Sequence, residues 1–157
     1  MTRDRFGVVT FRSSVALGLI LPWVTAIAVR ASLVSAGKPV MPWSWVASHL
    51  LVMMIFVPVF AAPFIVSGVW LRDFLDRDTR ASRRPAMGAA MGTVAALSLS
   101  TIWLHWQWWQ DVSDPMVLVF MPIFICAESS GWALAGGLIG YSVGLLIHST
   151  SGDKPRT

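Results

Sequence analysis

The sequence contains little charge, and this scarcity excludes an ordinary soluble domain. Only 13% of its 157 residues are Asp, Glu, Lys or Arg, whereas 55% are hydrophobic. Soluble domains carry about 25% charged residues. A chain of this composition has too much apolar surface for water, so we expect lipid to be its solvent.

Cysteine is nearly absent as well. Cys126 is the only one, so the chain cannot form an internal disulfide. We expect this residue to fill space in the protein core rather than to act as a reactive thiol.

The polar residues in the apolar stretches are too scattered to gather the several groups that a catalytic site requires. The sequence therefore predicts no enzymatic activity.

Long apolar runs are what the chain does contain. Four of them, at about 13–33, 45–71, 86–106 and 116–147, reach the roughly 20 residues that a helix needs to cross the hydrocarbon core. Helices satisfy their own backbone hydrogen bonds in lipid, so they are the expected spanning form. The sequence predicts an all-α, four-helix transmembrane bundle that forms a single multi-pass membrane domain over 1–157.

Basic residues are unevenly distributed between the two sides of this bundle. The amino-terminal tail, the second loop and the carboxy-terminal tail hold ten of the twelve, whereas the first loop has only Arg30 and Lys38. The positive-inside rule places both termini in the cytoplasm, and we expect a bacterial-type inner membrane. Nucleic-acid binding is not expected, because it needs a larger soluble basic face. The second-loop arginines are expected to contact anionic lipid headgroups: Arg72, Arg77, Arg80, Arg83 and Arg84.

The first apolar run also resembles a secretory signal peptide. Arginines precede it, and it ends in the small residues of Ala26-Ile27-Ala28, which are typical of a cleavage site. The run is long, however, and Pro22 interrupts it. Cleavage would leave three spans and break the charge alternation, so we interpret the run as a membrane span.

Prolines and the length of the last run predict irregular helices. Pro58 and Pro63 are expected to bend the second span. The last run has 32 residues, about 48 Å of helix, so it should tilt, project from the membrane or break near Pro122. Segment 56–60 (FVPVF) is similar in sequence to segment 120–124 (FMPIF). This similarity would make the chain two tandem helical hairpins related by an internal repeat. The alternative is chance similarity between two apolar helices.

Glu128 is the only acidic residue inside an apolar run. A charge at the bilayer centre costs about 2.5–3.5 kcal/mol, so this carboxylate needs a partner, a cavity or a proton. With Ser129 and Ser130 beside it, Glu128 is a candidate site for a proton, a cation or a substrate. A purely structural carboxyl is the alternative. Three nearby residues share its helix face: Gly131, Trp132 and Ala135.

His49 and His105 form a second candidate pair. Each histidine lies near the outer end of its span, the end that the charge pattern places on the non-cytoplasmic side. The two side chains should therefore lie at a similar depth in the membrane. Two facing imidazoles can ligate a b-type haem, and they can equally bind a metal ion or a quinone. The alternative is that both are interfacial polar residues among tryptophans.

Glycines spaced by four indicate close helix packing. They stack on one helix face in each of the last two runs, where small residues let backbones approach. We expect the glycines of the last run to pack inside the chain. The residues are Gly88 and Gly92 in the third run and Gly136, Gly140 and Gly144 in the fourth.

Three function classes follow from these features. The favoured one is a non-enzymatic accessory or assembly subunit, whose partners are the lipid bilayer and other membrane subunits or copies of itself. The first alternative is a small oligomeric transporter or channel that uses Glu128. The second is an electron-transfer subunit with haem b on His49 and His105.

Overall fold

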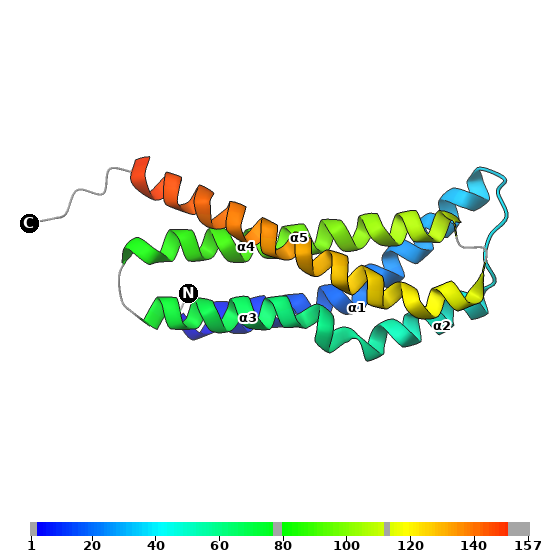
Figure 1. Ribbon diagram of the computed structural model, residues 1–157, viewed down its shortest axis with the longest axis horizontal. Helices are drawn as coiled ribbons and strands as arrows, with labels where there is room; N and C mark the ends of the chain where they lie inside the picture. The colour runs from blue at the N-terminus through cyan, green and yellow to red at the C-terminus, as the bar shows by residue number, and fades with distance from the viewer. Residues whose placement is uncertain (1–2, 77–79, 112–113, 151–157) are drawn as a thin grey trace, which may run out of the picture.

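The computed structural model describes residues 3–76, 80–111 and 114–150, and all the regular structure in these ranges is helical (Figure 1). The prediction of an all-α chain is therefore confirmed. The helices are α1 (Arg3–Ser35), α2 (Trp43–Ile55), α3 (Val57–Asp76), α4 (Arg80–Asp111) and α5 (Pro115–Thr150).

Three of these helices contain a segment that is long and apolar enough to cross a membrane. The segments are Phe11–Ser35 in α1, Arg84–Gln110 in α4 and Met116–Thr150 in α5. The fourth candidate span is a pair, α2 with the first part of α3 (Val57–Val66), bent by 41°. The length and composition of the described helices therefore indicate an integral membrane protein with three spans, or four if the bent pair is one span.

The bend between α2 and α3 has a local cause. Phe56 lies between the two helices, and its N–H donates to the carbonyls of Met53 at 3.1 Å and Val52 at 3.3 Å. Pro58 follows, and it has no N–H with which to bond the carbonyl of Met54. The second predicted span is thus two helices, and it bends beside Pro58 as expected, whereas Pro63 lies within α3, where no break is formed.

The last helix behaves differently. α5 continues through Pro122 and runs for 36 residues, about 54 Å. The break considered near Pro122 is therefore not formed. The two echoing segments also differ in structure, because 56–60 contains the α2–α3 break whereas 120–124 lies within a continuous helix.

The helices form one elongated bundle in which the start of α1 and the end of α5 lie at the same end (Figure 1). α4 and α5 make the most extensive contact, α1 packs on α3 and α4, and α2 packs on α5. At the opposite end of the bundle lie the α1–α2 connection and the tryptophans of α2 and α4, and we call it the tryptophan-rich end.

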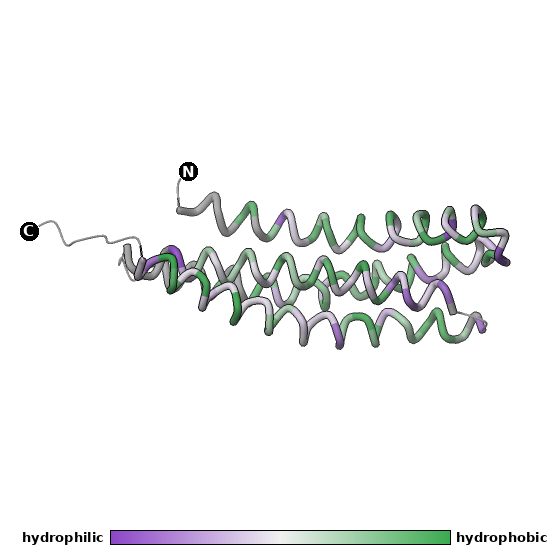
Figure 2. Tube along the Cα trace, turned by 90° about the horizontal axis from the view of Figure 1, so that it is seen from above, coloured by the Kyte–Doolittle hydropathy of each residue, from purple (hydrophilic) through white to green (hydrophobic). Residues whose placement is uncertain are grey.

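Apolar side chains cover the outside of this bundle as well as its inside. Figure 2 shows hydrophobic residues along most of the length of the helices. Leu134 and Leu138 of α5, for example, are each 71% exposed. A helix that is hydrophobic all round is typical of a membrane span, because lipid covers the face that neighbouring helices leave open.

Glycines let α4 and α5 touch backbone to backbone. A Cβ atom added to Gly92 would collide with the carbonyl oxygen of Gly136, and one added to Gly88 would collide with that of Gly140. Gly144 lies equally close to the backbone of Arg84 and Pro85. All five predicted packing glycines thus lie at this contact, within the chain.

Candidate functional site

His49 of α2 and His105 of α4 meet in the core near the tryptophan-rich end. Both side chains are 0% exposed. Their ring centroids lie 5.5 Å apart, with the planes at 71°. Trp109, one turn after His105, packs its ring edge-on against His49 at 5.0 Å. Sequence reasoning placed the two histidines at one depth, and the structure places them in contact.

Backbone carbonyls hold both imidazoles by the same ring nitrogen. His49 Nδ1 lies 3.1 Å from the carbonyl oxygen of Leu118, and His105 Nδ1 lies 2.7 Å from that of Thr101. A carbonyl oxygen only accepts, so each Nδ1 must carry a hydrogen and donate it. In this inferred tautomer each neutral ring keeps a lone pair on Nε2.

These two Nε2 atoms are buried without a hydrogen-bond partner among the described residues, and so is Nε1 of Trp109. Four buried side-chain atoms in the described ranges lack a partner, and three of them belong to this group of contacting rings. Leaving one such group unpaired costs about 1–3 kcal/mol. Their concentration at one place points to a bound ligand.

Two buried methionines lie one turn along their helices from residues of this group. Met53 follows His49 by one turn on α2, and Met121 follows Leu118 by one turn on α5. Met53 is 3% exposed and Met121 is 0% exposed, and both belong to the core cluster that includes Trp109. The described residues contain no group of three or more His, Cys, Asp or Glu side chains placed to hold a metal ion.

The arrangement of the rings favours an ion over a haem. In a bis-histidine haem the imidazoles approach the iron from opposite faces of the macrocycle, so the macrocycle separates them. Here the two rings meet edge to face with centroids 5.5 Å apart, and Trp109 packs directly against His49. Rings in this contact leave no room for a flat porphyrin between them.

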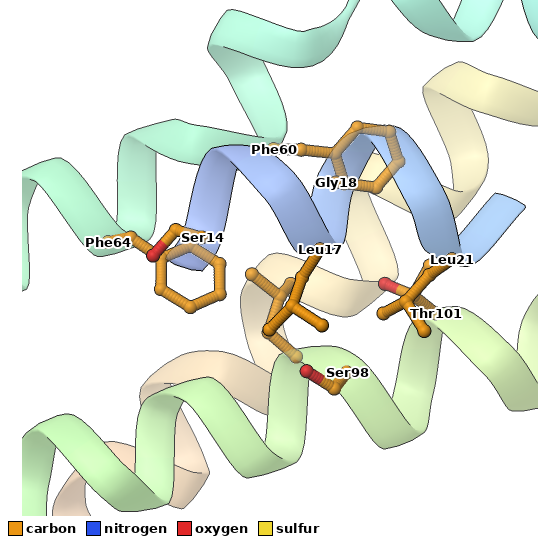
Figure 3. A pocket seen from close by; sticks show the side chains of 9 residues that line it. Ser14, Leu17, Gly18, Leu21, Phe60, Phe64, Ser98 and Thr101 are labelled. Carbon is orange, nitrogen blue, oxygen red and sulfur yellow. The ribbon is translucent and has the colours of Figure 1, made fainter. Parts of the chain in front are cut away.

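A small cavity between α1, α3 and α4 lies farther toward the bundle centre (Figure 3). Its volume is about 10 Å³, which is enough for one water molecule. The hydroxyl groups of Ser14, Ser98 and Thr101 line it, together with the rings of Phe60 and Phe64. It is too small for an organic substrate.

The structure separates the three residues of the other candidate site. Ser129 is 0% exposed and its hydroxyl lies 3.4 Å from that of Thr101 inside the bundle. Ser130 donates its hydroxyl to the carbonyl of Cys126 at 2.7 Å. Glu128, in contrast, is exposed on the outer side of α5.

The Thr101–Ser129 contact relates Glu128 to the candidate span of α4. Thr101 lies four residues, about 6 Å, from Leu97, the middle residue of the candidate span Arg84–Gln110. Ser129 pairs with Thr101, so its neighbour Glu128 also lies near the middle of that span.

Glu128 belongs to a continuous outer surface, which we call the Glu128 face. Its large members, Phe120, Phe124 and Trp132, follow the spacing of four and are 53%, 53% and 61% exposed. Gly131 completes the face, and a Cβ atom added there would meet nothing within 4 Å. Phe124 stacks on Trp108 of α4 at the edge of this face, with ring centroids 5.9 Å apart, and the other members of the face are not covered by the described helices.

Arginines considered in the sequence lie away from this face. Arg30 donates to the carbonyl of Met41, and its guanidinium lies 4.4 Å from the ring centroid of Trp43. Arg84 is exposed at the end of the bundle opposite the tryptophans. Of the remaining predicted headgroup contacts, Arg77 falls outside the described residues, and Arg72, Arg80 and Arg83 are described by their helical backbone alone.

Comparison of the chain with protein-family models, with curated proteins and with solved structures finds no match. Its function therefore has to be argued from the chemistry of its own residues.

Proposed function

We propose that this protein is a non-enzymatic subunit of a membrane complex, and that the Glu128 face binds a membrane-spanning helix of another subunit. The observation that carries the proposal is the exposure of Glu128 near the middle of the candidate span. The protein lies in a bacterial-type inner membrane with both termini cytoplasmic, as the distribution of basic residues favours.

The energetic argument concerns what surrounds the Glu128 carboxyl. Toward lipid, a charged carboxylate costs about 2.5–3.5 kcal/mol at the helix centre. A neutral carboxyl there also lacks hydrogen-bond partners, which is unfavourable in an apolar medium. A second helix that offers a donor at this depth removes the cost, so Glu128 favours a partnered state.

The shape of the Glu128 face supports a helix as the partner. Open space at Gly131 lets another backbone approach α5 closely, as α4 does at Gly136 and Gly140. Phe124 and Trp132 lie one turn before and one turn after Glu128 and offer aromatic surface. We therefore expect a partner helix with a small residue and a hydrogen-bond donor, such as Ser, Thr, Asn or a basic side chain, near its middle.

A second candidate function uses the same residue. If the outer faces of several copies meet around an axis, their Glu128 carboxyls line that axis, and the assembly becomes a small oligomeric transporter or channel. Both cavities described in a single bundle have volumes of about 10 Å³, so a transport path would have to lie between copies.

The test is affinity purification of the tagged protein in a mild detergent, followed by native mass determination and identification of co-purifying chains. We expect a hetero-complex that is lost in Gly131→Leu, because leucine fills the open space. Ala95→Leu is the matched control, since Ala95 is exposed on α4. The complex should survive that change.

Other outcomes separate the two candidates. A homo-oligomer without other chains, together with ion flux in proteoliposomes that Glu128→Gln abolishes, would replace the subunit function with transport. A monomer whose mass is unchanged by Gly131→Leu would contradict both.

A further inference from the structure

We propose that His49 and His105 form a binding site for one copper(I) ion, with the thioethers of Met53 and Met121 as the additional ligands. Both imidazole Nε2 atoms are buried without a partner in the described ranges, and Met53 and Met121 are buried one turn along their helices from His49 and from Leu118. The site is independent of the Glu128 face, so either proposal can fail without the other.

The histidines are prepared to ligate a metal. Metal-binding histidines almost always donate their second ring N–H to a carbonyl, a carboxylate or water, which fixes the tautomer and orients the ring. Leu118 and Thr101 supply that carbonyl here, from α5 and α4. Both Nε2 lone pairs remain free in the described part of the core.

The separation of the rings suits one ion. A metal–nitrogen bond of about 2.0 Å places the ion roughly 3 Å from the ring centroid, so two imidazoles on one ion have centroids at most roughly 6 Å apart. The observed 5.5 Å lies within that limit and corresponds to a bent arrangement. The ion would lie between the two rings, and Trp109 would cover it from the side of His49.

The chemistry of the surroundings selects the metal. Thioether sulfur and imidazole are ligands of copper(I), whereas zinc in structural sites takes four Cys or His ligands, and magnesium or calcium requires oxygen ligands. The described residues offer no third His, Cys, Asp or Glu side chain to the pair. A single positive charge also costs less to bury in this apolar core than a divalent ion, and no carboxylate there offsets it.

A water molecule is the competing occupant. Trp109 Nε1 offers one donor and the two Nε2 atoms offer two acceptors, which is a set that one water can satisfy. Water, however, makes no use of the two buried methionines, and the measurement must therefore report on sulfur.

The experiment is a titration of the purified full-length protein with copper(I) under anaerobic, reducing conditions, in competition with a coloured copper(I) chelator. X-ray absorption at the copper edge then identifies the ligand atoms. We expect one ion per chain, bound by two nitrogen atoms and one or two sulfur atoms. The His49→Gln/His105→Gln variant should lose this binding.

Adjacent methionines provide a matched pair of variants. Met53→Leu keeps the volume of a buried side chain and removes its sulfur, so the affinity should fall by at least about tenfold, the effect that even outer-shell partners have on metal sites. Met54→Leu changes a neighbour that is 53% exposed, and it should leave the affinity unchanged. Because both variants retain a well-packed helix, a folding defect cannot imitate this difference.

Three results would overturn the proposal. Binding far below one ion per chain would leave water as the occupant of the site. Equal affinities of Met53→Leu and Met54→Leu, with only nitrogen or oxygen in the absorption spectrum, would exclude the sulfur ligands. Zinc(II) displacing copper(I) at equal concentration would show that the site was assigned to the wrong metal.

Discussion

Neighbouring residues at the centre of α5 have opposite environments. Glu128 is exposed, whereas Ser129 is fully buried against Thr101. Successive residues on a helix are about 100° apart around the axis, so one residue can face a partner subunit while the next holds the bundle together. Position along the chain alone is therefore a poor guide to which residues form one site.

This contrast predicts opposite effects of leucine at the two positions. Ser129→Leu should lower the free energy of unfolding by about 1–3 kcal/mol, because the larger side chain overpacks the contact with Thr101. Glu128→Leu should change it by less than about 0.5 kcal/mol or raise it, because that side chain is exposed. Unfolding of the isolated protein in detergent, followed by circular dichroism, measures both, and equal losses would contradict the burial of Ser129.

The elements were predictable where hydrophobicity alone decides them. The length of the apolar runs predicted the approximate positions of the candidate spans and of the connection before Trp43, because a helix needs about 20 apolar residues to cross the hydrocarbon core. Proline was a weaker signal. The bend occurs beside Pro58, whereas Pro122 lies within a continuous helix. A proline leaves the carbonyl one turn before it without a backbone donor, and the packing of neighbouring helices decides whether the helix continues there.

The candidate site was less predictable than the elements. The depth of His49 and His105 follows from their places near the span ends. Their contact does not, because it depends on how α2 packs on α5 and α4 packs beside both. The outward direction of Glu128 relative to Ser129 follows from helix periodicity, but which side α4 covers is a tertiary property.

The contact of α4 with α5 predicts which glycines tolerate alanine. Gly92→Ala should cost about 1–3 kcal/mol, because its methyl group would collide with the backbone at Gly136. Gly131→Ala should stabilise the protein by about 0.5–1 kcal/mol, since it relieves the entropic cost of a helical glycine in open space. Thermal unfolding of both variants in detergent checks the difference, and a destabilised Gly131→Ala would place another element against that face.

The bend between α2 and α3 predicts the effect of removing Pro58. Pro58→Ala restores an N–H that can bond the carbonyl of Met54, so the two helices should straighten. Straightening a bend of 41° lengthens the distance between spin labels at positions 44 and 66 by about 2 Å. Electron resonance distance measurements in a Cys126→Ala background test this, and Pro63→Ala, which lies inside α3, should leave the distance unchanged.

At the scale of the whole molecule, the bundle has two chemically different ends. The described start of α1 and the end of α5 share one end with the end of α3 and the start of α4 (Figure 1). Arginines are frequent in these parts of α3 and α4, whereas the tryptophans of α2 and most of those of α4 lie toward the other end. Anionic lipid attracts basic residues and indole rings favour the headgroup level, so we expect this polarity to orient the bundle in a membrane.

That polarity predicts the topology. A fluorescent protein fused at the carboxy-terminus should be bright and alkaline phosphatase fused there should be inactive, because the positive-inside rule predicts that the end of α5 faces the cytoplasm. Alkaline phosphatase fused after Lys38, between α1 and α2, should be active. The reverse pattern of activities would invert the orientation, and phosphatase activity at both positions would contradict an even number of spans.

The division of contacts between the two halves of the chain has a consequence for its biogenesis. A ribosome synthesises α1, α2 and α3 first, but α1 packs on α4, and α2 packs on α5. His49 therefore enters the bilayer before either His105 or the Leu118 carbonyl that orients it exists. The α1–α3 contact can form early, but the proposed histidine site would be complete only after α4 and the start of α5 have been synthesised.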